Sequence, residues 1–174
     1  DILISFQRHT NTHQRNRCYD YFKKHLKKRC TFREYKNKNR TERDFLREYY
    51  VEIRRHKFNV CPPGAGFDCH RIWQTLILGS FPIVKNSWAW REFQDLPIWY
   101  VKKFTDVTKK AIDEKYEEIV DNLKAGKYNL DKINFDYWKR VMDDDRINFY
   151  KNYKEKNTGT TIHKAFSIDQ LPTG

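Results

Sequence analysis

The sequence predicts an α/β fold, a Rossmann-like parallel sheet with helices on both faces, followed by a C-terminal helix. Strand-like and helix-like segments alternate through most of the chain, which is typical of a parallel sheet. The helix-like segments carry their apolar residues on one side, as Cys18, Phe22 and Leu26 do at a spacing of four. The length of 174 residues fits one domain with an appended tail. We place this domain at 1–150 and the tail at 151–174, because periodicity fades from Lys151 onward.

The strands are expected at five short apolar segments, each of which ends at polar or turn-forming residues. A parallel sheet binds its ligands beyond the carboxyl ends of its strands, so we expect ligand contacts from the loops after Phe6, Cys61 and Val84. Two tryptophans, Trp88 and Trp90, lie in the loop between the last two strands. The predicted strands are Asp1–Phe6, Cys30–Tyr35, Lys57–Cys61, Phe81–Val84 and Ile98–Val101.

Capping residues mark where the helices between these strands begin and end. Asn11 or Thr12 is expected to cap the first helix, Thr41 with Asp44 the second, Asp68 the third, and Thr105 or Asp106 the fourth. Gly79 and Gly126 are placed to end the third and fourth helices in the left-handed conformation. A loop is expected at 36–40, and a last helix carries Phe135, Trp138, Val141 and Met142.

The formal net charge of +12 is large for this length and implies an anionic partner or neighbour. Nucleic acid, an anionic membrane surface and phosphorylated small molecules all satisfy this charge, as does a solvated basic face without a ligand. No apolar run reaches the roughly 18 residues that a membrane helix needs. The four cysteines show no zinc spacing and are interpreted as buried free thiols, with a disulfide left open.

The segment Cys61–Arg71 combines the features of an anion-binding turn. A strand ends at Pro62 and Pro63, Gly64 and Gly66 follow, and a helix begins. Glycines allow a ligand to approach the backbone closely, and Arg71 in the first helical turn can bind phosphate oxygens with two N–H groups. Gln74 lies on the same helix face and can hydrogen-bond a ribose hydroxyl. A common turn with structural roles for Asp68 and Arg71 fits the same residues, because the third glycine of a dinucleotide fingerprint is missing.

The run from Lys57 to Val84 resembles the exostosin-like glycosyltransferases, including those of large DNA viruses and the ribitol xylosyltransferase branch. The family pattern is a strand ending in Cys-Pro, a Gly-rich turn, Asp-x-His-Arg, Trp-Glu and Leu-Gly-x-x-Pro-Ile-Val. This sequence reads Cys61-Pro62, Asp68-Cys69-His70-Arg71, Trp73-Gln74 and Leu78-Gly79-Ser80-Phe81-Pro82-Ile83-Val84. The likeness extends over about residues 1–125 and is dense only from Phe58 to Val84.

The resemblance implies the C-terminal half of a GT-B glycosyltransferase, which binds a nucleotide diphosphate sugar, with a UDP-sugar as one candidate. The other implied partners are a glycan or glycoprotein acceptor and an acceptor-binding N-terminal domain of the same parent chain. No cofactor and no metal site are expected, and Asp143, Asp144 and Asp145 are interpreted as a solvated patch. Carried over by position, the donor site comprises Arg8, Thr10, Asn11, Arg15, Gly64, Gly66, Asp68, His70, Arg71 and Gln74.

Gln74 departs from the family, which has glutamate after the tryptophan, and an uncharged amide should hold a ribose less strongly, by about 1–2 kcal/mol. His70 is assigned a positioning role inside the motif, whereas His9 is interpreted as a solvated loop residue. Trp88 and Trp90 are suited equally to stacking on a sugar and to packing under a loop. The catalytic residues are not identified, which is consistent with half of an enzyme.

Two other functions are compatible with the sequence. The main alternative is a non-catalytic basic module that binds nucleic acid or a polyanionic glycan through the Lys/Arg-rich first helices. A degenerate transferase kept as a scaffold is the other, with Gln74 as its support. Because the chain starts at Asp1 without an initiator Met, it is interpreted as a fragment. The cytoplasm of a virus-infected cell and the Golgi lumen both remain open as locations.

Overall fold

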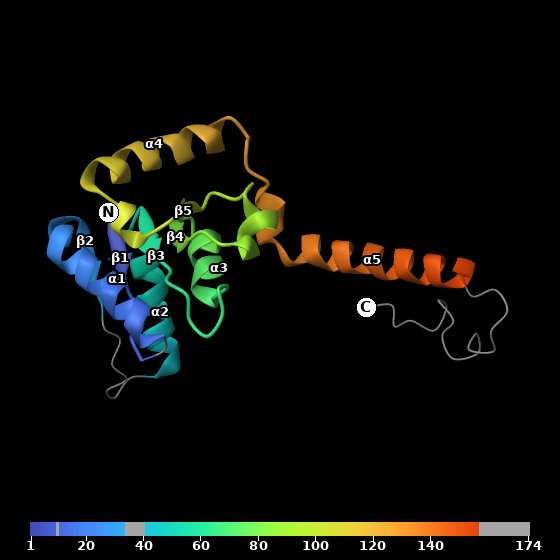
Figure 1. Cartoon of the computed structure of the whole chain (residues 1–174), viewed down its shortest axis with the longest axis horizontal. Helices are drawn as coiled ribbons and strands as arrows, with labels where there is room; N and C mark the ends of the chain where they lie inside the picture. The colour runs from blue at the N-terminus through green and yellow to red at the C-terminus, as the bar shows by residue number, and fades with distance from the viewer. Residues whose placement is uncertain (10, 34–40, 157–174) are drawn as a thin grey trace. The chain divides into compact units, whose positions relative to one another are not determined.

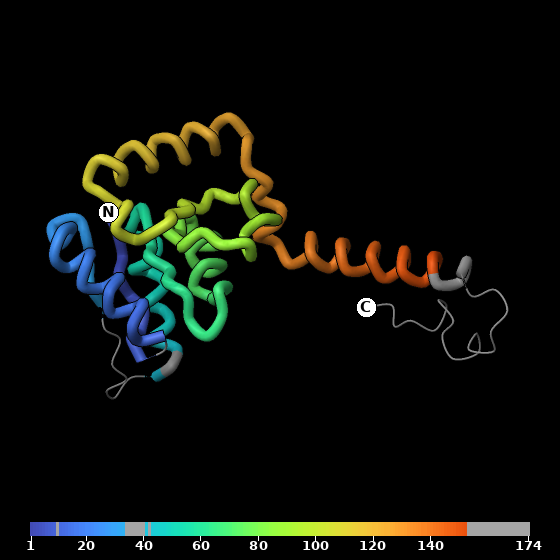
Figure 2. Tube along the Cα trace, viewed as in Figure 1, coloured from blue at the N-terminus to red at the C-terminus, as the bar shows by residue number. Residues whose placement is uncertain are grey.

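The computed structural model describes residues 1–9, 11–33 and 41–156, and the chain divides into two compact units at Ile133 and Asn134 (Figure 1). The first unit alternates strands and helices, as the tube in Figure 2 lets the reader follow. It contains β1 (Ile2–Ile4), α1 (Thr12–His25), β2 (Cys30–Phe32), α2 (Glu42–Arg54), β3 (Phe58–Val60), α3 (His70–Ile77), β4 (Phe81–Lys85), β5 (Trp99–Val101) and α4 (Lys109–Lys124).

The five strands form one sheet in which every neighbouring pair is parallel, in the order β2-β1-β3-β4-β5. The predicted parallel sheet is therefore confirmed. The chain moves outward from β1 to β2, returns across the sheet to β3, and then moves outward in the other direction. This is the order of a doubly wound fold, whose direction of winding reverses between β1 and β3.

Successive residues of a strand point to opposite faces, so each face of the sheet has its own core. Ile2 and Ile4 of β1 lie in a cluster with α1 and α4, whereas Leu3 packs against Tyr49 and Ile53 of α2. A third cluster brings α3 and the loop after β4 to the second face. The sheet is thus covered on both faces, as predicted.

Several helix ends follow the predictions, and three differ for local reasons. Thr41 accepts the backbone N–H of Asp44, and Gly79 and Gly126 have φ of 77° and 65°. Asn11 occupies the N-cap of α1, but its side chain bonds Gln14 and does not cap the helix. Helix α4 begins later than predicted, after Thr108, whose hydroxyl oxygen accepts the N–H of Ala111.

The third difference concerns α3, which is not capped by Asp68. Cys69 is its N-cap, and the Asp68 carboxylate accepts a hydrogen bond of 2.9 Å from the Trp73 indole N–H instead. The predicted loop at 36–40 lies outside the described residues, as do residues 34 and 35, the end of the predicted second strand.

The second unit is described through α5 (Phe135–Lys156), a helix of 22 residues. It confirms the predicted last helix but continues past Lys151, where a tail had been expected to begin. On this helix, Asp143 of the acidic run 143–145 forms an ion pair with Arg146 one turn away. Within residues 1–9, 11–33 and 41–156, no helix combines the length and the apolar character that crossing a bilayer requires.

Candidate functional site

The candidate site lies where the winding of the sheet reverses, beyond the carboxyl ends of β1 and β3. Helix α1 leaves β1 toward one face of the sheet and α3 leaves β3 toward the other. The two loops therefore diverge and leave a crevice between them, which is where open α/β sheets bind ligands. Here the crevice is a cavity of about 470 Å³, called the switch-point cavity below.

Arg15 of α1 joins the two loops that border this cavity. Its Nε donates to the Pro63 carbonyl at 3.0 Å, its Nη1 to the Gln7 carbonyl at 2.7 Å, and its Nη2 lies 3.5 Å from the Pro62 carbonyl. The side chain is 6% exposed, and burial, with the nearby Arg71 guanidinium, lowers its pKa. Arg15 thus holds the loops after β1 and β3 in place, and it also brings positive charge to the cavity wall.

The Gly-rich turn after β3 packs directly against this arginine. A Cβ atom at Gly64 would lie 3.1 Å from Arg15 Nη2, so a larger residue would require the guanidinium to move by a few tenths of an ångström. The Gly64 N–H donates to the Gly66 carbonyl at 3.0 Å, which closes the turn. Glycine at position 64 thus lets the Arg15 side chain lie close to the backbone, while the approach of a ligand to the two glycines stays a prediction.

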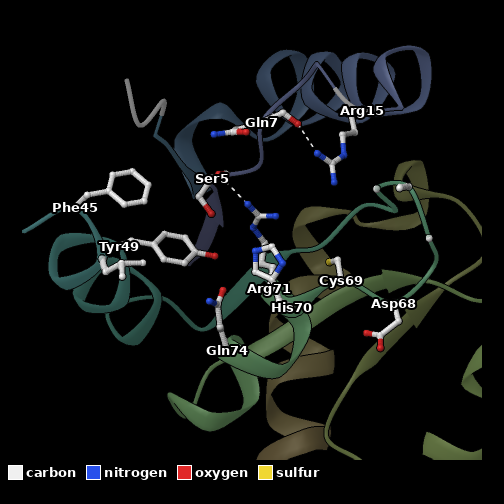
Figure 3. Close-up of a pocket in the computed structure, with 14 residues that line it drawn as sticks. Ser5, Gln7, Arg15, Phe45, Tyr49, Asp68, Cys69, His70, Arg71 and Gln74 are labelled. Carbon is white, nitrogen blue, oxygen red and sulfur yellow. Dashed lines mark hydrogen bonds between the residues drawn. The ribbon is translucent and has the colours of Figure 1, made fainter. Parts of the chain in front are cut away.

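Arg71 lies on the opposite side of the cavity, in the first turn of α3, and crosses to β1 (Figure 3). Its Nη2 donates to the Ser5 carbonyl at 3.3 Å, whereas its Nε is buried and has no hydrogen-bond partner in the described part of the chain. A buried charged donor without a partner is costly unless a water molecule or a ligand supplies an acceptor.

A buried polar network beneath Arg71 fixes α3 against the sheet. Asn59 of β3 is fully buried, its amide donates to the Thr75 hydroxyl at 3.0 Å, and its carbonyl oxygen lies 3.5 Å from the Ser5 hydroxyl. Thr75 in turn donates to the Arg71 carbonyl at 2.7 Å. These hydrogen bonds join α3 to β3 and to the residue that follows β1, below the cavity.

Gln74 and the first turns of α2 complete the cavity. The Gln74 side chain is directed toward Tyr49 in Figure 3, and its Oε1 is buried without a hydrogen-bond partner among the described residues. Phe45 and Tyr49 line the same wall, with their rings nearly parallel at 11° and their centroids 6.5 Å apart. Burial raises the pKa of Tyr49 to about 12, so its hydroxyl is protonated at neutral pH. The wall is therefore aromatic, with the Tyr49 hydroxyl as its one polar group from these two rings.

The structure brings most of the predicted site residues together. Seven of them line the cavity, namely Arg15, Gly64, Gly66, Asp68, His70, Arg71 and Gln74. Arg8 does not line it, because its guanidinium lies 4.4 Å from the centre of the Tyr19 ring. Asn11 lines a different cavity, and Thr10 lies outside the described residues. The lining also includes residues that the sequence did not single out, Ser5, Gln7, Phe45, Leu46, Tyr49, Ala65 and Cys69.

A comparison with known protein families now identifies the chain. The model of the RXYLT1 C-terminal domain matches residues 8–124, more than half of the sequence. The chain belongs to the RXYLT1 C-terminal domain family. This membership confirms the resemblance found in the sequence and identifies a domain of a glycosyltransferase family, which implies a sugar donor and a glycan acceptor. No curated protein matches the chain.

The matched range of the RXYLT1 C-terminal domain includes α1, α2 and α3, and hence both arginines of the cavity. It also includes the two loop tryptophans, which the structure separates. Trp90 is 2% exposed and packs with Phe93 and Tyr100, whereas Trp88 is 83% exposed and available for stacking. Packing is therefore the use of Trp90, while stacking stays a prediction for Trp88.

The cysteines of this RXYLT1-type domain are free thiols. Cys18 and Cys61 are buried, and burial raises the pKa of both. Cys69 is partly exposed at the cavity. In the part of the chain that the structure describes, no cluster of three or more His, Cys, Asp or Glu side chains is arranged to hold a metal ion.

Proposed function

We propose that the switch-point cavity binds the diphosphate and ribose of a nucleotide sugar, and that the chain is the donor-binding half of a GT-B glycosyltransferase. One observation carries this proposal: Arg71 Nε, a charged donor, and Gln74 Oε1, an acceptor, are both buried without partners in the same cavity. A diphosphate oxygen satisfies the first atom and a ribose hydroxyl the second.

The surroundings of these two atoms suit a nucleotide diphosphate. Arg15 and Arg71 bring two positive charges to one cavity, and the pKa of Arg15 is lowered in part by Arg71, as expected of close like charges. A bound diphosphate would relieve this repulsion. The aromatic wall formed by Phe45 and Tyr49 offers an apolar surface for the nucleoside.

The chemistry assigned to this half is stabilisation of the leaving group. In the transfer, the bond between the anomeric carbon and the β-phosphate oxygen breaks while a bond to an acceptor hydroxyl oxygen forms. The acceptor proton passes to a general base, and the bonding electrons leave with the nucleoside diphosphate. In this proposal Arg71 stabilises that growing charge, and no metal ion is required. The base is expected from the acceptor-binding domain of the parent protein.

Calorimetric titration with UDP, other nucleoside diphosphates and nucleotide sugars tests the proposal. Arg71→Gln should lower affinity by about 30-fold, equivalent to about 2 kcal/mol for a hydrogen-bonded charge. Arg91→Gln is the matched control, because it removes the same charge from a side chain that is 85% exposed and paired with Glu92. Its affinity should remain within about twofold of wild type.

Salt dependence separates the proposal from the alternative of a polyanion-binding module. A diphosphate in a cavity should lose little affinity between 50 and 200 mM salt, whereas heparin or DNA on a basic face should lose about 10³-fold or more. Absence of binding by every nucleotide, together with salt-sensitive heparin binding that Arg71→Gln leaves intact, would contradict a donor site in this chain.

A further inference from the structure

A second cavity of about 480 Å³ opens at the same edge of the sheet, beyond the ends of β4 and β5. Its wall is formed by α1, by Lys85 at the end of β4, and by residues 103–105 after β5. Buried Cys18 and Phe104 contribute to the lining. A cavity of this size at the carboxyl edge of a parallel sheet is suited to a small organic ligand.

Four basic side chains from three segments converge on this second cavity. His13 and Arg17 lie one turn apart on α1, Lys85 ends β4, and Lys103 follows β5. Some basic side chains elsewhere do form ion pairs, as Arg29 does with Asp113 and Lys110 with Glu114. Within the described part of the chain, none of the four forms an ion pair.

Among the residues that the structure describes, no carboxylate lines the second cavity. The neighbouring Asp106 carboxylate accepts the backbone N–H of Lys103 at 2.9 Å, and so caps the short turn after β5. Gln14 accepts a hydrogen bond from Asn11 Nδ2 at 3.1 Å, which leaves its own amide N–H groups as donors. The lining thus gathers positive charge and hydrogen-bond donors without a matching negative group, an arrangement that favours an anion.

The second cavity is separate from the switch-point cavity, with which it shares no lining residue. Helix α1 divides the two, since Arg15 lines the first while Gln14 and Arg17 line the second. The four basic residues therefore take no part in the site proposed for the nucleotide.

We propose that the second cavity is an oxyanion site for a phosphate or sulfate group carried by a small ligand other than the nucleotide sugar. Arg17 would bind two of its oxygens, while Lys85 and Lys103 neutralise its charge from the strand ends. Phe104 and Cys18 offer an apolar floor for the organic part of the ligand. This proposal does not depend on nucleotide binding.

Amide NMR spectra of the chain, titrated with inorganic phosphate and sulfate, test the site. We expect saturable shifts at residues 13–17, at Lys85 and at residues 103–105. Titration with a hexose 6-phosphate and with the free hexose separates the sources. Tighter binding of the ester than of phosphate indicates a phosphorylated organic ligand, and equal binding indicates the free anion.

Two double variants with equal loss of charge distinguish a built site from general attraction. Arg17→Gln with Lys85→Gln should weaken phosphate binding about tenfold or more. Lys24→Gln with Lys28→Gln, at exposed positions outside the cavity, should change affinity less than about twofold. Equal losses in both would overturn the proposal, as would shifts confined to Ser5, Gly66 and Arg71. Unchanged phosphate shifts in Arg71→Gln show that the two cavities act separately.

Discussion

The two arginines of the switch-point cavity differ in what their guanidinium groups bond. Arg15 bonds the backbone of both bordering loops, whereas Arg71 keeps one buried N–H without a partner. Arg15→Lys should therefore lower the free energy of unfolding by about 2 kcal/mol, because an ammonium cannot reproduce the planar set of donors. Urea denaturation measures the change.

Arg17→Lys, two residues along the same helix, is the control for this prediction. The Arg17 side chain is exposed and forms no ion pair among the described residues, so stability should change by less than about 0.5 kcal/mol. Equal effects of the two substitutions would show that the carbonyl bonds of Arg15 do not stabilise the fold.

Gln74 offers a test at the same scale, because the resembled family has glutamate in its place. A carboxylate accepts hydrogen bonds from ribose hydroxyls more strongly than an amide does. A glutamate at position 74 would line the same cavity as Arg15 and Arg71. Gln74→Glu should therefore raise affinity for a nucleoside diphosphate about tenfold in calorimetric titration. A loss of affinity, with stability retained, would show that the amide N–H groups are what the ligand uses.

At the scale of elements, the buried network of Asn59 and Thr75 holds α3 to the sheet. Asn59→Ala should cost about 2 kcal/mol of stability, since it leaves the Thr75 and Ser5 hydroxyls without this partner in an interior position. Thr75→Val in the same background should cost less than it does alone, by about 1 kcal/mol. Thermal or urea unfolding of the four proteins measures that coupling, and strict additivity would contradict a direct bond.

The elements were largely predictable because their signals are local. Apolar periodicity located the helices, and the left-handed ends at Gly79 and Gly126 follow from the residue type. The start of α3 was not predictable in the same way, because the Asp68 carboxylate bonds the Trp73 indole and not the helix end. Such a competition between partners is decided by tertiary packing.

The part of the switch-point cavity that comes from one continuous segment of the chain could be predicted from the sequence. The Gly-rich turn, Arg71 and Gln74 lie within a short stretch and share a cavity, as their spacing indicated. Phe45 and Tyr49 reach the same cavity from α2, and the pattern of that helix indicates only an apolar face. Which strand the face covers depends on the winding of the whole sheet, so no local signal could have found this wall.

At the scale of the molecule, three thiols whose pKa is raised by burial contribute to the dependence of stability on alkaline pH. Burial raises the pKa of Cys18 and Cys61 above the ordinary value of a thiol, and burial raises the pKa of Cys30 to about 12. A raised folded-state pKa means that the folded protein holds its proton after the unfolded chain has lost it. Their contribution is therefore fully present below about pH 8.5 and is lost as pH rises toward the folded-state value.

We expect stability to be nearly flat from pH 6 to 8 and to fall above pH 9. Each buried thiol should add about 1.4 kcal/mol per pH unit to that fall. Cys61→Ala removes one such group, so its stability should decline less steeply between pH 9 and 11, whatever its stability at pH 7. Cys69→Ala, at a partly exposed position, should leave the slope near wild type. Guanidinium denaturation at each pH measures the slopes. Identical slopes for wild type and Cys61→Ala would show that the buried thiol does not govern alkaline unfolding.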